Sequence, residues 1–236
     1  MTLSRLMLGL AVLAALLLFG SGFGTRFGLW PFPVGFQVLK WAAYLGVGVA
    51  LVALAGLFVP KLRAGGGPLL VVSAVLGLGV AAVPAYWIQA AREAPPIHDI
   101  STDLEDPPAF AAVLARRGHG SNPVEHGGAA VAEAQRSSYP DIRPLTLEIA
   151  PADAFALALR AARDMGWEIV AQDTASGRVE ATATTFWFGF KDDVVVRVVP
   201  SGPGSRIDVR SLSRVGVGDV GANAKRIRKY FTRLAG

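Results

Sequence analysis

The first ninety residues form three long apolar runs separated by short basic stretches. Positions 6–25 and 41–60 carry no charged residue, and neither do positions 64–91. A helix rises about 1.5 Å per residue, so roughly 20 residues cross a hydrocarbon core of about 30 Å. The pattern therefore predicts three transmembrane helices, at about residues 6–25, 38–60 and 68–90, in an N-terminal region of residues 1–91.

The first run also has features of a signal peptide, because Arg5 precedes an uninterrupted apolar stretch. A cleavage site of the small-x-small type is missing, and Gly20-Ser21-Gly22 is a poor substitute. We therefore expect this segment to be retained as the first span.

Basic residues at the ends of the runs predict the orientation. The amino terminus and Arg5 precede the first span, and Lys61 and Arg63 lie in the second loop. This small bias predicts a cytoplasmic N-terminus, and three crossings then place the C-terminal domain outside the cytoplasm. The expected location is a multi-pass position in a membrane, with the bacterial inner membrane favoured.

Residues 92–144 lack a regular hydrophobic period and begin with a proline-rich stretch, "APPIHDISTDLEDPPAF". Pro-Pro disfavours a helix, so this segment is expected to wrap the folded core in extended form. A short helix is predicted from Gly128 to Arg136.

Regular alternation begins at Leu145 and continues to the C-terminus. The pattern predicts a strand at 145–149, a helix starting at Pro151 and ending at Gly166, and a closing helix capped by Asp219. Four further strands are predicted at 167–173, 178–188, 194–199 and 206–214. Short turns join these strands, so residues 145–236 are expected to form an α+β domain with two layers, an antiparallel sheet covered by helices on one face.

Alternate positions give this sheet one apolar and one charged face. The predicted apolar face carries Val179, Ala181, Ala183, Val194, Val196, Val198, Ile207 and Val209. On the opposite face, Glu180, Arg197, Asp208 and Arg210 are placed to form a ladder of ion pairs between strands. That face is either a solvated, salt-bridged surface or a ligand-binding surface.

The run "FWFGF" at 186–190 is followed directly by Lys191-Asp192-Asp193, where a hairpin turn is expected. Regular pairing would place Phe186, Phe188 and Phe190 on the charged face and direct Trp187 to the core. This aromatic rim either packs under the proline-rich segment or meets lipid headgroups. Asp192 and Asp193 are adjacent in a strand and point to opposite faces, which argues against an acid–base pair.

The composition of the chain argues against several classes of function. The formal charge of +5 lies entirely before Arg92, and the remainder has 18 basic and 18 acidic residues, so we expect no nucleic-acid partner. The chain has no cysteine. The acidic cluster of His98, Asp99, Asp103, Glu105 and Asp106 does not have the spacing of a calcium loop. No cofactor and no metal are therefore expected.

The closing helix is basic and amphipathic. It carries Lys225, Arg226, Arg228, Lys229 and Arg233 without an acid between them. The apolar stripe of Ala224, Ile227, Phe231 and Leu234 suits docking on the sheet. The basic face is then either solvated or in contact with anionic headgroups.

Five segments together are similar to one family: "IHDISTDLEDPPAF", "YPDIRPL", "GWEIVAQD", "GRVEATATTFWFGFKDDVVVRV" and "SRIDVRSLSRVGVGDVGANAKRIR". Over roughly residues 95–235 the chain resembles the family catalogued as domain of unknown function 1499. The resemblance implies a bacterial or plastid envelope-type domain without an established activity, and it implies no catalytic roles. It marks as motif positions Asp103, Trp187, Phe188, Lys191, Asp192, Asp193, Arg197, Asp208, Arg210, Ser213, Arg214, Asp219, Asn223 and Arg226.

The expected function is that of a non-enzymatic envelope module whose extracytoplasmic domain binds membrane lipids or a partner in the membrane. The candidate ligand-binding residues are Trp187, Phe188, Lys191, Asp192, Asp193, Arg197, Asp208, Arg210, Arg214, Asn223 and Arg226. One alternative is an enzyme acting on an envelope lipid or glycan, with its site at Asp192, Asp193, Asp208 and Arg210. Another is a scaffold subunit of a protein assembly.

Overall fold

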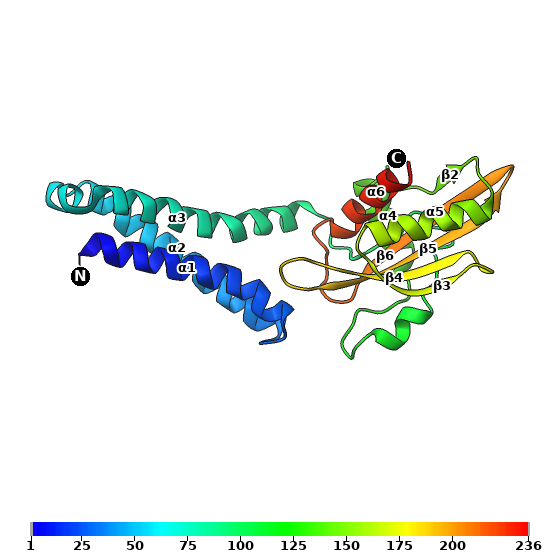
Figure 1. Cartoon of the computed structure of the whole chain (residues 1–236), viewed down its shortest axis with the longest axis horizontal. Coiled ribbons are helices and arrows are strands. Elements are labelled where there is room, and N and C mark those ends of the chain that lie inside the picture. Colours follow the sequence, from blue (N-terminus) through cyan, green and yellow to red (C-terminus); the bar gives the residue numbers. More distant parts are fainter. Residues whose placement is uncertain (1, 236) are drawn as a thin grey trace. The chain divides into compact units, whose positions relative to one another are not determined.

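The structure is a computed structural model that describes residues 2–235, and it contains two compact units (Figure 1). The first consists of Met1–Ala90 together with Phe186–Gly189. The second consists of Ala91–Thr185 and Phe190–Gly236.

The first unit contains three helices that are long and apolar enough to cross a membrane: α1 (Leu3–Arg26), α2 (Phe32–Leu57) and α3 (Pro60–Glu93). The second helix starts earlier than predicted because prolines are tolerated in a first helical turn, and Pro33 stands there. The third is interrupted at Gly66, where the backbone leaves helical geometry just before Pro68. The main part of α3 therefore starts close to the predicted residue 68.

Small residues are prominent in the contacts between these helices, and many large apolar side chains face outward. Ala11, Ala42 and Ala53 are fully buried, whereas Leu16, Trp41 and Leu51 are each more than 60% exposed. A Cβ atom on Gly77 of α3 would overlap the carbonyl oxygen of Gly46 in α2. Such small-residue packing, with bulky side chains outside, is typical of helices that associate in lipid.

The second unit is built on an antiparallel sheet with the strand order β1-β6-β5-β4-β3, and β2 also pairs with β6. Its strands are β1 (Asp99–Ser101), β2 (Leu145–Leu147), β3 (Glu168–Asp173), β4 (Arg178–Thr184), β5 (Lys191–Ser201) and β6 (Gly204–Ser213). The predicted meander of β3 to β6 is confirmed. The first strand was not predicted, because three residues are too short to show alternation.

Helices cover one face of this sheet, as predicted. They are α4 (Gly128–Ser138), α5 (Pro151–Asp164) and α6 (Ala222–Ala235). Figure 1 shows α5 and α6 lying over the strands. The main core joins the predicted apolar positions of β4, β5 and β6 to Ala154 and Ala158 of α5 and to Ile227 and Tyr230 of α6. The Tyr230 hydroxyl donates to the Ala158 carbonyl oxygen at 2.8 Å, which ties the two helices together.

The opposite face is also covered, and this corrects one expectation. Residues 103–124, here called the strap, cross the charged face and include a short 3-10 helix, η1 (Ala112–Arg116). Phe110 and Val113 of the strap pack on Val195 and Leu212 of the sheet in a second apolar cluster. The solvated alternative for the charged face is therefore wrong, because the face is buried beneath the extended segment.

The β4–β5 hairpin differs from its predicted form. Lys191, Asp192 and Asp193 belong to β5 and not to a turn, and β4 ends at Thr184. The turn comes earlier, where the Thr185 amide donates to the Phe190 carbonyl oxygen at 2.8 Å. Gly189 adopts φ +69°, a conformation that favours glycine.

Trp187 does not enter the core of the sheet, contrary to the prediction. Its indole N–H donates to the Phe19 carbonyl oxygen of α1 at 3.2 Å. In the same unit, the Phe188 ring lies 5.1 Å from that of Phe36, and Arg26 donates to the Phe186 carbonyl oxygen at 2.9 Å. The aromatic residues 186–188 therefore pack with the long helices and do not form a rim beneath the strap.

Candidate functional site

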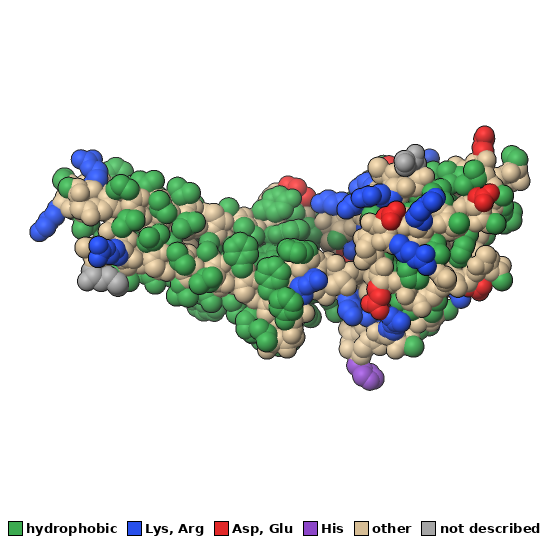
Figure 2. Space-filling view, in the orientation of Figure 1, with side chains coloured by type: hydrophobic (Ala, Val, Ile, Leu, Met, Phe, Trp, Pro, Cys, Tyr) green, Lys and Arg blue, Asp and Glu red, His purple; other side chains and the backbone are tan. Residues whose placement is uncertain are grey.

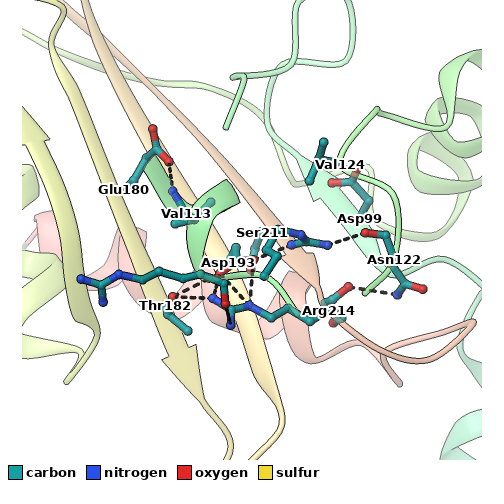
Figure 3. A network of polar contacts seen from close by, with 12 residues as sticks. Asp99, Val113, Asn122, Val124, Glu180, Thr182, Asp193, Ser211 and Arg214 are labelled. Carbon is teal, nitrogen blue, oxygen red and sulfur yellow. Dashed lines mark hydrogen bonds and ion pairs between the residues drawn. The ribbon is translucent and has the colours of Figure 1, made fainter. Parts of the chain in front are cut away.

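The strap is held to the sheet by buried ion pairs, and the most enclosed of these is centred on Asp193 of β5 (Figure 3). Asp193 is fully buried, and both of its oxygens accept hydrogen bonds from Arg214, the shortest at 2.7 Å. The Thr182 hydroxyl donates to Asp193 at 3.1 Å, and Arg117 of the strap forms a further ion pair with it. One carboxylate thus joins β4, β5, the strap and the residue that follows β6.

A second pair connects β6 to the first strand. Arg210 donates to both oxygens of Asp99, at 2.9 and 2.7 Å, in the planar two-bond geometry that arginine favours. Two of its other three N–H groups reach carbonyl oxygens of the strap, at Pro108 and Val124, and its guanidinium stacks over the Phe110 ring at 4.9 Å. Four of the five guanidinium N–H groups of Arg210 therefore have protein acceptors.

A third group lies towards the other end of the same face. Arg197 donates to Asp208 directly opposite it in the sheet, at 3.0 Å, and to Asp103 of the strap at 3.0 Å. Burial alone would raise the pKa of Asp103, but backbone N–H bonds and the charges of Arg206 and Arg197 together lower it below its usual value. Asp103 is therefore held ionised against the sheet.

Glu180 completes the network from β4. Its side chain is fully buried, and its oxygens accept the backbone N–H groups of Ala111 and Val113 at 3.0 Å (Figure 3). These N–H groups open η1, so the carboxylate satisfies donors that would otherwise be unpaired at the start of that helix.

Five of the predicted ligand-binding residues meet on this face: Asp193, Arg197, Asp208, Arg210 and Arg214. Each of them forms hydrogen bonds and ion pairs with other protein groups, and the strap covers them. Their role in binding a ligand remains a prediction, while their structural role is to close the face.

Three other candidates gather on the helix-covered side, where they fasten α6 to the sheet. Arg226 forms an ion pair with Asp192 and donates to the Ser211 hydroxyl at 2.9 Å. The Asn223 amide donates to the Ser213 hydroxyl at 2.9 Å and to the His98 carbonyl oxygen at 3.0 Å. The opposite directions of Asp192 and Asp193 are therefore confirmed.

Asp219 caps α6 as predicted. Its carboxylate accepts the backbone N–H groups of Gly221 at 2.8 Å and Asn223 at 2.7 Å. Burial raises the pKa of Asp219 above its ordinary value, although these two hydrogen bonds act in the opposite direction.

The outward face of α6 carries a stripe of cations, here called the basic stripe, consisting of Lys225, Lys229 and Arg233. They are spaced four residues apart and therefore lie on one side of the helix. All three are exposed, and none has an ion-pair partner within residues 2–235. Figure 2 shows basic side chains gathered over this helix.

A shallow pocket of about 250 Å³ opens beside the basic stripe. Its walls are Met165, Gly166 and Trp167 from the turn after α5, Ala183 and Thr184 from the end of β4, and Lys225, Arg226 and Lys229 from α6. The walls contain three cationic side chains and no carboxylate. This charge imbalance suits an anionic ligand.

Sequence reasoning recognised the basic helix but missed the pocket. Lys225 and Lys229 stood in the basic cluster, yet nothing local in the sequence indicates that the turn at 165–167 lies beside them. Of the remaining candidates, Lys191 is exposed at the start of β5, and Trp187 and Phe188 lie with the long helices.

The carboxylates of the acidic cluster around residue 100 form ion pairs with arginines. Asp99 faces Arg210, Asp103 and Asp106 face Arg197, and Glu105 faces Arg136. Within the described part of the chain, no three potential ligands converge as a metal site requires.

Replacement of Asp193 tests the structural importance of the buried network. Asp193→Asn leaves the charges of Arg214 and Arg117 buried without a counterion, so we expect the free energy of unfolding of the domain to fall by about 3–5 kcal/mol. Amide hydrogen exchange of β5 and β6 in the full-length protein measures this change.

Glu168→Ala is the matched control, because it removes the exposed ion pair between Glu168 and Arg116 of the same η1. We expect it to cost at most about 1 kcal/mol. Equal effects of the two substitutions would contradict a network that holds the strap.

The family described as "Protein of unknown function (DUF1499)" matches residues 99–234. A search of curated proteins found no match. Among solved structures, the chain is similar to the crystal structure of TTHA0849 from Thermus thermophilus, with 12% identity, a TM-score of 0.25 and coverage of 39% of this chain and 90% of that chain. A similarity at this TM-score supports no inference about the fold or function of this chain. Since the family match spans more than half of the sequence, the chain belongs to the DUF1499 family.

Proposed function

We propose that this protein is a three-span membrane protein whose C-terminal domain binds anionic lipid headgroups without catalysing a reaction. The observation that carries the proposal is the basic stripe of α6, three exposed cations without an ion-pair partner among the described residues. Anionic headgroups attract such residues by about 1 kcal/mol each close to the surface.

The three long helices support insertion in a bilayer. Each is long and apolar enough to span one, and the helices bury small residues while exposing Leu and Trp side chains. In water this arrangement would leave large apolar side chains hydrated, whereas lipid would solvate them. Only residues 94–98 separate α3 from β1, a stretch of at most roughly 20 Å, so the tether keeps the domain near the membrane surface.

The proposed location is the bacterial inner membrane, with the N-terminus in the cytoplasm and the C-terminal domain outside. The support is the positive charge of Arg5, Lys61 and Arg63 at the helix ends that are proposed to face the cytoplasm. A reporter enzyme that is active only outside the cytoplasm, fused after Gly236, is expected to be active. Activity of a cytoplasm-restricted reporter at the same position would reverse the orientation.

The absence of catalysis is proposed because the residues of the enzymatic alternative are engaged in ion pairs. Asp192, Asp193 and Asp208 are at most 3% exposed, and each contacts an arginine. A general acid or base must reach the proton that it transfers. The strap buries Asp193 and Asp208, and Asp192 is buried beside α6, which supports a binding module over an enzyme.

The basic stripe predicts that α6 approaches anionic bilayers. The chain has no cysteine, so Thr232→Cys on the exposed side of α6 gives a single site for an environment-sensitive dye. In full-length protein reconstituted into nanodiscs, adding phosphatidylglycerol to phosphatidylcholine is expected to shift the dye emission to the blue. Because the attraction is electrostatic, high salt should reverse the shift.

Replacing Lys225, Lys229 and Arg233 by alanine should remove about 3 kcal/mol of attraction and most of the dye response. The matched control replaces Arg143, Arg160 and Arg163, which are exposed and make no ion pair within residues 2–235. This control loses the same charge but should keep the response. An identical dye spectrum in neutral and anionic nanodiscs at low salt would contradict the proposal.

A further inference from the structure

We propose that the pocket beside the basic stripe is a phosphate-binding site, in which Lys225, Lys229 and Trp167 hold the phosphate group. The inference rests on the proposed function and deepens it, since it names the chemical group recognised and the side chains that recognise it. Attraction of α6 to a membrane requires only charge, whereas a phosphate site requires donors that converge on one place.

The helix wall of the pocket supplies two available ammonium groups. Lys225 and Lys229 are one turn apart on the same face of α6, and both line the pocket. Arg226 lies between them in the sequence, but its charge is compensated by Asp192. Like charges one turn apart repel each other, and a bound anion relieves that repulsion. Lysine binds phosphate as a compact charge with three donors, so two lysines satisfy several phosphate oxygens.

The part of the pocket formed by the turn after α5 and the end of β4 supplies neutral donors. Trp167 is 7% exposed, and its indole N–H has no hydrogen-bond partner among the described residues. Its ring is fixed by stacking on Tyr230, with centroids 5.0 Å apart and an angle of 20° between the planes. The Thr184 hydroxyl, at the end of β4, likewise has no partner within residues 2–235. Donors without a protein partner are available to a ligand or to water, and a ligand that accepts from them gains those hydrogen bonds.

Size and lining restrict the ligand class. A volume of about 250 Å³ is below the range of pockets that enclose a drug-sized molecule, so the site suits one headgroup or a small phosphoester. Met165, Trp167 and Ala183 add apolar surface beside the donors. This surface fits the glycerol portion of a phospholipid or of a soluble glycerol phosphate. The shared chemistry is a phosphate ester, and the source is decided by experiment.

Nuclear magnetic resonance of the tryptophan side chains reads the site directly. The full-length protein, labelled with ¹⁵N-tryptophan in a neutral detergent, contains five indole signals. Trp167→Phe identifies the Trp167 signal by its loss and keeps an aromatic ring against Tyr230. The probes are inorganic phosphate, glycerol phosphate and a short-chain phosphatidylglycerol, each compared with chloride at equal ionic strength.

We expect a saturable shift of the Trp167 signal with at least one phosphate probe. Saturation with the short-chain lipid alone assigns the site to lipid headgroups, and saturation with glycerol phosphate or inorganic phosphate assigns it to soluble phosphates. Lys225→Ala with Lys229→Ala should weaken the response at least about tenfold, because charge-assisted hydrogen bonds are lost. Arg143→Ala, which removes an exposed charge outside the pocket and outside the basic stripe, should leave the affinity within about twofold.

Two results would overturn the inference. One is a Trp167 signal that responds to no phosphate probe. The other is a Trp167 response in the protein with both Lys225→Ala and Lys229→Ala that equals the response of the unsubstituted protein. The dye attached at position 232 separates this failure from that of the proposed function. A dye response to anionic nanodiscs without a shift of the Trp167 signal supports the attraction to the membrane and contradicts the phosphate site. A saturable Trp167 response without a dye response supports the site and removes the attraction to the bilayer.

Discussion

The burial of Asp193 between Arg214 and Arg117 is the interaction on which the organisation of the domain depends. A carboxylate without solvent contact is tolerated only when positive groups and hydrogen-bond donors surround it. Those groups come from the strap, from β4 and from the end of β6, so the ion pair holds together segments that are distant in sequence. Asp99 with Arg210 and Asp103 with Arg197 extend the same arrangement along the sheet. The charged face is consequently closed.

Arginine and lysine have different roles in this domain. Arginines form the buried and bridging pairs, where a planar guanidinium can serve several acceptors at once. The lysines at 191, 225 and 229 are exposed and have no ion-pair partner within the described residues. Lysine is strongly hydrated and loses little by remaining at the surface until an anion arrives. This division explains why a domain with balanced charge still presents a local basic surface on α6.

Much of the fold could be predicted from local pattern, and much of the candidate site could not. Alternation in β4, β5 and β6 identified the core face, and Pro151 and Asp219 marked the starts of α5 and α6, because these signals act between near neighbours. The partner of Arg210 is Asp99, 111 positions away, and no local signal selects it among the other acids. From the sequence, a solvated face and a ligand-binding face therefore remained as alternatives for the charged side of the sheet. The pocket was missed for the same reason, since Trp167 meets α6 only through the tertiary fold.

The strap closes the charged face, and we propose that α6 carries the surface that binds anionic lipid. Amide hydrogen exchange of the full-length protein, compared between neutral and anionic bilayers, reports on both surfaces in one experiment. We expect anionic lipid to slow exchange in α6 and around residues 165–167 and to leave residues 103–124 unchanged. Altered exchange along the strap and β6, with none in α6, would contradict it and place recognition on the charged face.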